Sequence, residues 1–548
     1  MRRSRVGGFG WFSGLCLMGL SCGGAPTDGP PPVAQAVAAT SATEVASHPA
    51  PVVRAVAPLS GSLAGSPQPQ FRVSGARAAL VEICADRACT QPSQAFIAVN
   101  GSGRPVLPLS PGVVFWRAHA VALNAAWTPV WELFVPPGGS AASATRGLRL
   151  DVDGDGFADA AVRDQNDEAA TDRLHVYRGS AGGLVPASDT VLTLDTSHFG
   201  IPAISAGDVN GDGFGDLAVA DGRGLVVYAG SASGISPAPL SITPAPASTS
   251  PFLFASYLVA GGDVDGDGYG DVFADDNGQH VWLYLGSPAG LSATPAWTLD
   301  RTNTGRNAEL LTAADLNGDG FADLVVMDFG PDGTPQAFRV FRGSAAGLEP
   351  AAAGTLVVRP NLPSGTAGDV NGDGIPDLVT TEVTQLAFFP GGPAFPPAAP
   401  TEVVPTAERA MPLQLADFNG DGLADLAATT SVPSSTSFYF TDDRVDVYPG
   451  TPAGFAPAPT VTIHETDVLP DDTLNFVRLT AADFNQDGTD DLIVGAQAPF
   501  PTPFFDSSKP AVFVFDGSPA GLQPAPALEI TGAPGYASWV SAAAPQFP

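Results

Sequence analysis

The chain has 548 residues, of which 56 are Asp or Glu and only 24 are Lys or Arg, so its formal net charge is −32 at pH 7. This length is well beyond one ordinary domain and predicts several structural units. The scarcity of basic residues excludes the cationic surface that nucleic-acid binding requires.

The N-terminus has the pattern of an export signal. Three arginines within the first five residues precede a mostly apolar stretch that runs to Leu20. This pattern predicts a secretory signal peptide over 1–22, too short to span a bilayer as a mature helix. The Ser21-Cys22 junction resembles a bacterial lipobox, which implies lipidation of Cys22, although Gly19 stands where that family prefers Leu. The alternative is an ordinary signal peptide with an incidental cysteine.

A lipidated Cys22 implies an exported protein of the bacterial cell envelope that touches the membrane only through its N-terminal lipid. Gly23 follows the cysteine, where an Asp would retain a lipoprotein of enteric bacteria at the inner membrane. We therefore expect the outer membrane. Residues 23–52 are mainly Ala, Pro, Thr, Ser and Val without aromatics, and this composition predicts a disordered tether.

Residues 53–138 contain short strand-like runs separated by turn residues, and they predict a small β-sandwich. These runs are Gln70–Val73, Ala79–Ile83, Val113–Ala118 and Val130–Val135. The stretch Leu109–Ala118 resembles one strand of bacterial fibronectin type III-like modules. That resemblance rests on a single motif.

Cys84 and Cys89 lie five residues apart in this predicted module. In an oxidising compartment they can close a hairpin disulfide, which we favour. The alternative is a pair of metal ligands, but a closed zinc site needs two further ligands that the neighbouring sequence does not supply.

From residue 139 to 548 a nine-residue pattern, DxDGDGxxD with Asn allowed at position 3, occurs seven times at a period of about fifty residues. Oxygen ligands at positions 1, 3 and 5, a carbonyl at position 7 and a carboxylate at position 9 suit a hard cation, and we expect up to seven Ca²⁺ ions. A glycine at position 6 of every loop frees the turn from Cβ hindrance.

The predicted ligands are Asp151, Asp153, Asp155, Phe157 and Asp159 in loop 1; Asp208, Asn210, Asp212, Phe214 and Asp216 in loop 2; Asp263, Asp265, Asp267, Tyr269 and Asp271 in loop 3; Asp315, Asn317, Asp319, Phe321 and Asp323 in loop 4; Asp369, Asn371, Asp373, Ile375 and Asp377 in loop 5; Asp417, Asn419, Asp421, Leu423 and Asp425 in loop 6; and Asp483, Asn485, Asp487, Thr489 and Asp491 in loop 7. Loop 7 is the weakest match, because Gln486 replaces the usual glycine at position 4.

These loops differ from EF-hands. An EF-hand has a bidentate Glu at position 12 and flanking helices. Here position 12 is never a carboxylate, and each loop leads into a strand-like run such as Asp216–Val219. The alternative is a set of acidic surface turns, since Asp, Asn and Gly are common turn residues. Seven copies with the same oxygen positions favour metal binding.

Each unit contains four strand-like runs, and the third ends in a turn of the Gly-Ser-x-x-Gly-Leu type, as in Trp282–Leu291. Seven units of four strands without a helical pattern predict an all-β fold: a seven-bladed β-propeller preceded by the small β-sandwich. The run Tyr536–Ala542 resembles a first strand without its loop. It either pairs into the first blade and closes the ring or begins an incomplete eighth blade.

The repeats, about 400 residues in all, resemble FG-GAP/VCBS repeats, the calcium-loop blades of the integrin α-subunit propeller and its bacterial relatives. The resemblance implies calcium on the face that carries the hairpins between strands 1 and 2, with partners on the opposite face. It implies no ligand, because the chain has no Arg-Gly-Asp tripeptide.

Motifs for catalysis are missing from the sequence: the six histidines are scattered, and no nucleophile elbow or phosphate loop occurs. We therefore expect a monomeric adhesion or recognition module that binds a glycan or protein on a cell surface and is not an enzyme. The alternatives are a calcium-dependent glycan-active enzyme of the polysaccharide lyase type and an envelope scaffold.

Aromatics in the predicted loops 429–443 and 495–510 form a candidate binding patch, or they cap the channel or extend strand 3. These aromatics are Phe438, Tyr439, Phe440, Phe500, Phe504 and Phe505.

Overall fold

The computed structural model describes residues 52–541, except for 123–124, 140–144, 166–171, 196–201, 303–306, 358–363, 383–384, 407–409, 434–439, 469–474, 498–510 and 532–535. The predicted signal peptide, the lipidation site Cys22 and most of the tether lie outside the described residues. Across the described part, no helix is long and apolar enough to cross a membrane.

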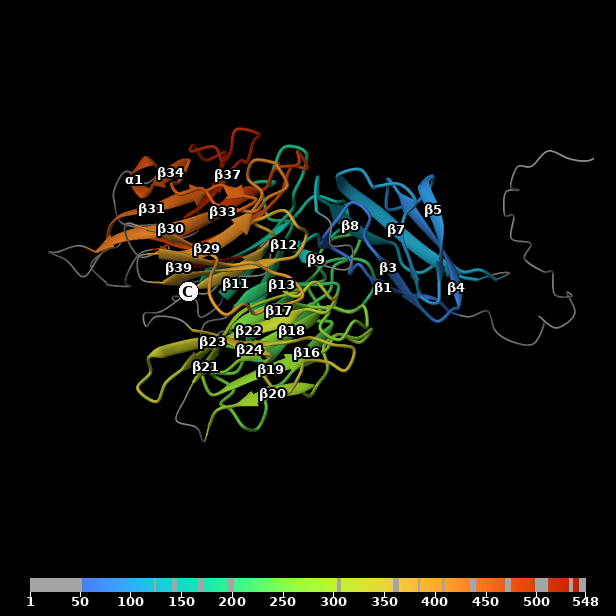
Figure 1. The fold of residues 1–548 in the computed structure, drawn as a ribbon, viewed down its shortest axis with the longest axis horizontal. Coiled ribbons are helices and arrows are strands. Elements are labelled where there is room, and N and C mark those ends of the chain that lie inside the picture. The colour runs from blue at the N-terminus through green and yellow to red at the C-terminus, as the bar shows by residue number, and fades with distance from the viewer. Residues whose placement is uncertain are drawn as a thin grey trace, which may run out of the picture. The chain divides into compact units, whose positions relative to one another are not determined.

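The N-terminal module is one curled sheet (Figure 1). Eight of its strands lie before residue 136, and the ninth, β9, comes from the following segment; the hydrogen-bonded order is β1-β3-β6-β5-β4-β7-β8-β2-β9. The strands are β1 Arg54–Ala57, β2 Ser62–Ala64, β3 Phe71–Ser74, β4 Ala78–Cys84, β5 Pro92–Val99, β6 Ser102–Gly103, β7 Gly112–Ala120, β8 Trp131–Val135 and β9 Thr145–Leu148. The expected all-β unit is therefore present, built from one continuous sheet rather than from two separate layers.

Alternating burial shows that this sheet has an apolar inner face and a more exposed outer face. Inward-facing residues of β4 are buried while their neighbours are partly exposed, as a strand with one apolar face requires. The inner faces enclose a core in which Phe71 and Trp116 meet edge to face at 5.0 Å between ring centroids, and Trp116 meets Trp131 at 5.4 Å.

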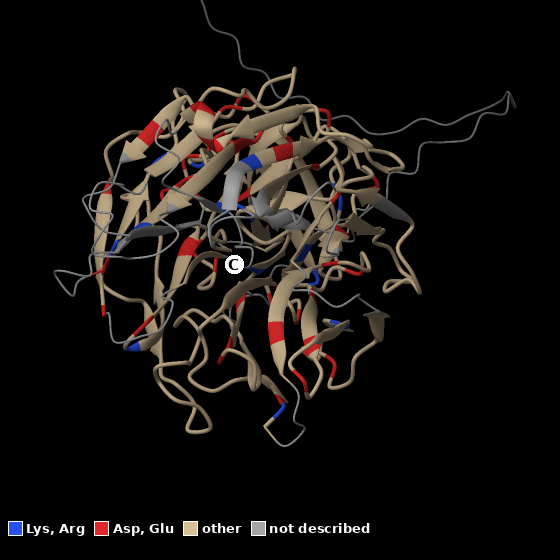
Figure 2. Ribbon diagram, turned by 90° about the vertical axis from the view of Figure 1, so that its left-hand side faces the viewer, with Lys and Arg blue, Asp and Glu red and all other residues tan. Residues whose placement is uncertain are grey.

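Seven four-stranded antiparallel sheets follow, so the predicted seven-bladed propeller is confirmed. Figure 2, at right angles to Figure 1, shows the sheets around a common centre. The blades are β39-β10-β11-β12 (Tyr536–Ser541, Ala160–Gln165, Asp172–Tyr177, Thr190–Leu194), β13–β16 (Ala203–Gly207, Asp216–Asp221, Gly224–Tyr228, Ser241–Thr243), β17–β20 (Leu258–Gly262, Asp271–Asp275, His280–Tyr284, Trp297–Asp300), β21–β24 (Ala308–Ala314, Asp323–Phe329, Pro335–Phe341, Gly354–Val357), β25–β28 (Gly365–Gly368, Asp377–Glu382, Gln385–Phe389, Glu402–Pro405), β29-β30-β31-β34 (Ala410–Ala416, Asp425–Pro433, Phe440–Tyr448, Val461–His464) and β35–β38 (Asn475–Ala482, Asp491–Gln497, Ala511–Phe515, Leu528–Thr531).

A short hairpin, β32 Gly450–Thr451 with β33 Gly454–Phe455, and one short helix, α1 Glu465–Val468, complete the described elements. The middle strands of a blade are buried on both faces, as in β14 and β15, because each sheet packs between two neighbours. Their continuous apolar runs therefore mark the core of the propeller.

The ring is closed by the C-terminal strand β39, which pairs antiparallel with β10 as the innermost strand of the first blade, Val162 opposite Val540. This outcome confirms the latch and removes the alternative of an incomplete eighth blade. The strand before loop 1, β9, does not take that place, because it pairs with β2 of the N-terminal module. The inner strands β39, β13, β17, β21, β25, β29 and β35 contact one another in sequence around the ring.

The prediction of a loop over 429–443 is wrong over most of its length, because β30 extends to Pro433 and β31 begins at Phe440. The two strands form a long hairpin in which Pro433 pairs with Phe440. The other aromatics of the candidate patch, from Phe438 to Phe505, lie outside the described residues.

Candidate metal centres

The carboxylate at position 1 organises every loop. In loop 2, Asp208 Oδ1 accepts the Gly211 N–H at 2.6 Å and Oδ2 accepts the Gly213 N–H at 2.7 Å. The bond from the position 6 N–H recurs in all seven loops. Gly211 and Gly213 have φ values of 76° and 98°, so the chain curls through the left-handed region at positions 4 and 6. Gln486 adopts the same region, with φ 57°.

Positions 3 and 5 continue the curl. In loop 2, Asn210 Oδ1 accepts the Asp212 N–H at 2.8 Å, and Asp212 Oδ1 accepts the Phe214 N–H at 3.0 Å. The same two bonds occur in each of the other loops. Short polar side chains thus replace the missing backbone ladder in these tight bends.

The position 9 aspartate joins the loop to the glycine turn that ends strand 3. In loop 2, Asp216 Oδ1 accepts the Gly230 N–H at 3.0 Å and Oδ2 accepts the Val209 N–H at 2.9 Å. The bond to the turn glycine is present in all seven blades. The two repeat markers of the sequence are therefore one structural unit.

The turn glycine is required because nothing larger fits beside the loop. A Cβ on Gly286 would lie 2.8 Å from Val209 O and closer still to Gly270 O, the position 8 carbonyl of its own loop. The same overlap with the position 8 carbonyl occurs at the turn glycine of every blade. The serine that follows closes the turn, as when Ser287 Oγ donates to Gly290 O at 2.7 Å.

Neighbouring loops are also bonded to one another. The position 8 N–H of one loop donates to the position 1 carbonyl of the preceding loop, as from Gly215 to Asp151 and from Gly270 to Asp208, both at 2.8 Å. The link from Ala158 to Asp483, at 3.4 Å, joins the first loop to the last. Loop 5 cannot donate this bond, because Pro376 occupies its position 8. The loops therefore form a belt around one face of the ring.

Three of the predicted ligand positions converge in the two loops with Asp at position 3. Ligand oxygens of Asp151, Asp153 and Asp159 lie within 4.8 Å of one another, and so do those of Asp263, Asp265 and Asp271. The position 5 carboxylates Asp155 and Asp267 belong to neither group. Among the described residues, the three acids of the Asn-containing loops do not come within that mutual distance, and each position 5 carboxylate accepts the position 7 N–H.

Burial makes the charged form of these carboxylates unfavourable unless a cation lies close to them. Asp208 and Asp216 are both 0% exposed. Burial and then repulsion by Asp212 raise the pKa of Asp208 to about 8, and burial raises that of Asp323 to about 8. Burial raises the pKa of Asp151 to about 7. A buried carboxylate without a compensating charge is costly.

The residues of loops 1 and 3 fit a calcium ion by their geometry, because their acidic oxygens converge. Their donors are oxygens, which Ca²⁺ prefers. In loop 4 the buried Oδ2 of Asp323 has no hydrogen-bond partner, where the equivalent atom of Asp216 accepts a backbone N–H. A cation at the centre of the curl would satisfy that oxygen together with Asp315 and Asn317.

Sequence reasoning missed groups that approach the loops from elsewhere. Arg178, just before the turn glycine of blade 1, pairs with Asp153 at 2.5 Å. Asp516 holds the same place in blade 7, and burial together with repulsion from Asp487 raises its pKa. Arg178 and Asp516 each stand directly before a turn glycine, and this shared position in the repeat could have indicated that both lie close to a loop. Glu132 of the N-terminal module interacts with the carboxyl group of Asp151, and nothing in its local sequence indicates that contact.

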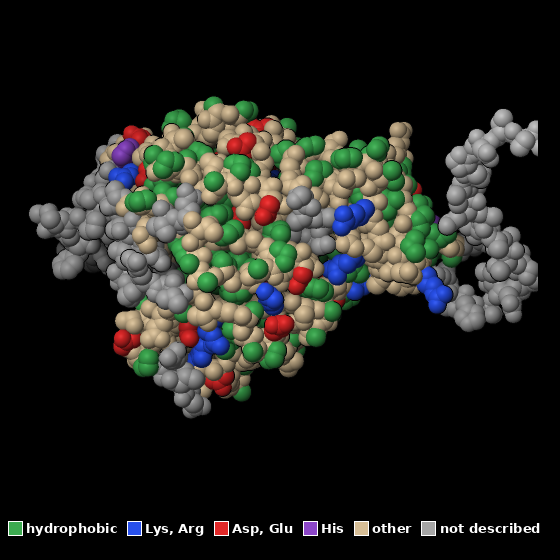
Figure 3. All heavy atoms as spheres, in the orientation of Figure 1, with side chains coloured by type: hydrophobic (Ala, Val, Ile, Leu, Met, Phe, Trp, Pro, Cys, Tyr) green, Lys and Arg blue, Asp and Glu red, His purple; other side chains and the backbone are tan. Residues whose placement is uncertain are grey.

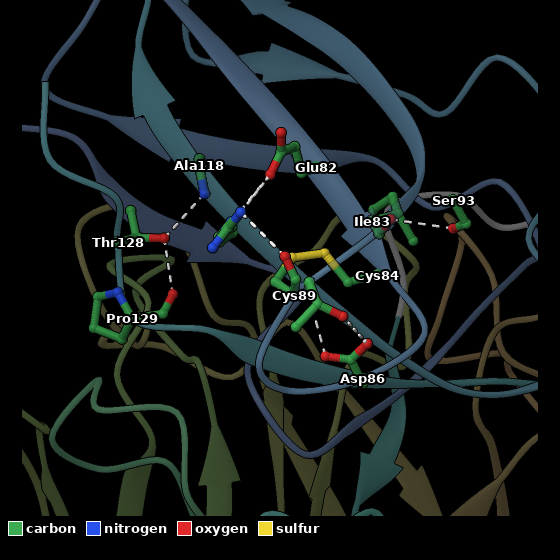
Figure 4. Close-up of a disulfide and its surroundings, with 11 residues drawn as sticks. Glu82, Ile83, Cys84, Asp86, Cys89, Ser93, Ala118, Thr128 and Pro129 are labelled. Carbon is green, nitrogen blue, oxygen red and sulfur yellow. Dashed lines mark hydrogen bonds and ion pairs between the residues drawn. A yellow bond between two sulfur atoms is a disulfide. The ribbon is translucent and has the colours of Figure 1, made fainter. Parts of the chain in front are cut away.

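Cys84 and Cys89 are joined in a disulfide in the N-terminal module (Figure 4). Glu82 lies beside it and pairs with Arg117 at 2.8 Å. Because the two sulfurs are bonded to each other, this group is a crosslink at the end of β4 rather than a pair of metal ligands.

Comparison with known proteins supports the repeat. The FG-GAP-like repeat family matches residues 151–219, 263–326 and 369–428, and the FG-GAP repeat family matches residues 476–507. Among solved structures, this chain is similar to an Agrocybe aegerita lectin that was described for its specific recognition of non-reducing terminal N-acetylglucosamine. The similarity covers 73% of this chain and 97% of that one, at 17% identity and a TM-score of 0.42. BBS1N in complex with ARL6DN is similar over 65% and 97%, at 14% identity and a TM-score of 0.35. Likenesses at this level say nothing about what this chain binds. The chain carries FG-GAP-like repeats folded as a seven-bladed β-propeller.

Proposed function

We propose that this chain is a calcium-binding propeller that acts by recognition at the cell surface rather than by catalysis. The observation that carries the proposal is the belt of seven acidic loops. Each loop curls on the same hydrogen bonds, acidic oxygens converge in loops 1 and 3, and six of the seven loops donate a backbone bond to the preceding loop. Such a belt is a structural brace, because its backbone bonds join neighbouring blades at their loops.

The residues that would hold the ions are the side chains at positions 1, 3, 5 and 9 and the carbonyl at position 7 of each loop. A bound divalent ion supplies positive charge to buried carboxylates. A ligand that binds only the folded chain stabilises it by RT ln(1+[L]/Kd), or roughly 2.7 kcal/mol per site at a hundredfold excess over Kd. Seven filled sites would make the ring rigid.

A rigid ring with a dedicated metal face leaves the opposite face for a partner. Figure 3 views the propeller from its side, where charged side chains lie singly or in small groups among uncharged atoms. The net charge of −32 disfavours a polyanion, and the proposed partner is a glycan or a protein. Export and attachment through Cys22 at the outer membrane remain part of the proposal, on the sequence pattern alone.

Metal content is the first measurement. We expect about seven calcium ions per purified chain by elemental analysis, and chelation should lower the melting temperature clearly. A calcium-free protein with an unchanged melting temperature would overturn the metal part of the proposal.

Recognition is tested on immobilised glycans and on whole cells, with and without calcium. Capture that requires calcium and forms no product supports a recognition module. Release of unsaturated sugars would instead establish the lyase alternative. No capture, together with a stable envelope partner in pull-downs, would favour a scaffold.

A further inference from the structure

One arginine of the N-terminal module bonds to two of the acidic loops. Arg87, in the turn between β4 and β5, donates from Nε to Gly154 O of loop 1 at 2.6 Å and from Nη1 to Gly213 O of loop 2 at 2.9 Å. Its guanidinium also stacks over the ring of Phe214 at 4.5 Å. Ser60 Oγ donates to the same Gly213 carbonyl at 2.9 Å. The module is therefore anchored on the metal-loop face, on backbone groups that the loop geometry presents.

Two further arginines of the module repeat this contact on the next loops. Arg54 lies 4.5 Å from the ring of Tyr269 in loop 3, and Arg72 lies 5.5 Å from the ring of Phe321 in loop 4. The contacted aromatics all occupy position 7. Loops 5 to 7 have Ile, Leu and Thr at that position. In loops 2 to 4, an arginine of the module therefore contacts the aromatic ring at position 7.

The fit is close enough that two loop glycines have no room for a side chain. A Cβ on Gly213 would overlap Val130 O of the module, and one on Gly268 would lie 2.8 Å from Val56 Cα. In contrast, a Cβ on Gly488, at the same position 6 in loop 7, would meet nothing within 4 Å. The glycines of loops 2 and 3 therefore serve the docking as well as the turn.

The charges at this interface do not balance without a cation. Loops 1 to 3 contribute eleven aspartates at ligand positions, and the module adds Glu132, which is 1% exposed. Glu132 pairs with Arg87 at 2.8 Å and interacts with the carboxyl group of Asp151. Among the described residues, the arginines found beside these loops are Arg54, Arg72, Arg87 and the propeller's own Arg178. They are too few to compensate twelve acids in a buried contact.

We propose that divalent ions in loops 1 to 3 hold the N-terminal module on the propeller, with Arg87 as its anchor and Glu132 as an acid that the module adds to the first metal site. This inference rests on the proposed calcium binding. The ions offset the negative charge that would otherwise repel Glu132, and they keep the Gly154 and Gly213 carbonyls in the positions that Arg87 reaches. Loss of the ions should therefore release the module from the ring.

Docking is measured on the full chain by amide hydrogen exchange and by the radius of gyration in solution, each in calcium and in chelator. In chelator we expect the peptides that contain Ser60, Arg87 and Trp131 to exchange about tenfold faster, and the radius of gyration to increase. The peptides of β4 and β7 inside the module should keep their protection, which distinguishes release from unfolding.

Matched variants separate docking from loop strain. Gly213→Ala and Gly488→Ala both place a side chain at a positive φ, 98° and 90°, but only the first meets the module. In calcium, Gly213→Ala should speed exchange at Ser60 and Arg87 while Gly488→Ala leaves it unchanged. Arg87→Ala should act as Gly213→Ala does, whereas Arg223→Ala, which removes the Arg223–Asp221 pair at the end of β14 away from the loop, should not.

The role of Glu132 has its own measurement. Glu132→Gln should weaken the binding of one calcium ion by about tenfold in a titration, whereas Glu82→Gln, in the module's other Arg–Glu pair, should change none. If calcium binds but chelation and Arg87→Ala leave the interface peptides protected, the docking inference is overturned and the metal belt stands. If no calcium binds, the proposed function fails first, and docking that persists without metal would overturn this inference too.

Discussion

The carboxylate of Asp216 accepts the backbone N–H of Gly230 at 3.0 Å, and through this bond the acidic loop of a blade holds the turn at the end of its third strand. Asp216 is fully buried and also accepts the Val209 N–H. The same aspartate is the last predicted metal ligand of its loop. The proposed metal site and the closure of the blade therefore share one side chain.

Asp216→Asn should destabilise the protein and remove one metal ion. An amide keeps one acceptor oxygen but turns an NH₂ group toward one of the two N–H donors, and leaving a buried donor unsatisfied costs about 1–3 kcal/mol. Denaturant unfolding in calcium and elemental analysis measure the two effects. Asp421→Asn, at position 5 of loop 6, is the control, because Asp421 Oδ1 accepts the Leu423 N–H and Asn can do the same. Equal losses of stability in both variants would contradict the role assigned to Asp216.

Gly286→Ala should lower the stability of the third blade by about 1–3 kcal/mol, because the new Cβ would lie 2.8 Å from Val209 O and closer to Gly270 O. Thermal unfolding measures this loss. Gly182→Ala, in the corresponding turn of the first blade, is the matched control, since its Cβ would come no closer than 3.9 Å to Ser180 Oγ. We expect it to shift stability by less than about 0.5 kcal/mol. A neutral Gly286→Ala would show that the turn can move away from the loop.

Removal of residues 536–548 should open the ring. β10 would lose its partner β39 and become an exposed strand edge, which favours pairing with another molecule. We expect a lower melting temperature and self-association by light scattering. Removal of 542–548 alone spares β39 and should change neither property. A monomer of unchanged stability after the longer truncation would mean that β39 does not hold the ring closed.

The metal-free protein should lose stability as the pH rises. Burial raises the pKa of Asp208 and of Asp323 to about 8 in the folded chain, far above the ordinary value of 3.8 that applies to the unfolded chain. The folded state then binds more protons, so this contribution is complete below about pH 4 and is lost on the way to about pH 8.

Melting temperatures in chelator between about pH 5 and pH 8 test this prediction, and they should fall with pH. With calcium present the slope should reverse, because protons compete with the ions for the same oxygens. A melting temperature in chelator that rises across this range would contradict the assigned burial of the carboxylates.

Local chemistry made much of this protein predictable. The DxDGDGxxD loop depends on side chains bonding to backbone groups two to five residues away, as Asp208 does with Gly211 and Gly213, so its presence follows from the residues themselves. The strand that leaves each loop and the glycine turn that ends strand 3 are equally local. Seven copies of these signals were sufficient to predict seven blades.

Contacts between distant residues could be settled only by the tertiary structure. No local pattern shows that β9 joins the module sheet, or that β39 pairs with β10 in its place. Strand pairing depends on which edges meet after folding. The position of Arg87 against Gly154 and Gly213, and of Glu132 against Asp151, is likewise decided by how the module lies on the ring. The sequence by itself determined the repeating loop and the number of blades, since those are short-range hydrogen-bond patterns; the tertiary structure decided the ring closure and the docking, since those depend on long-range packing and charge.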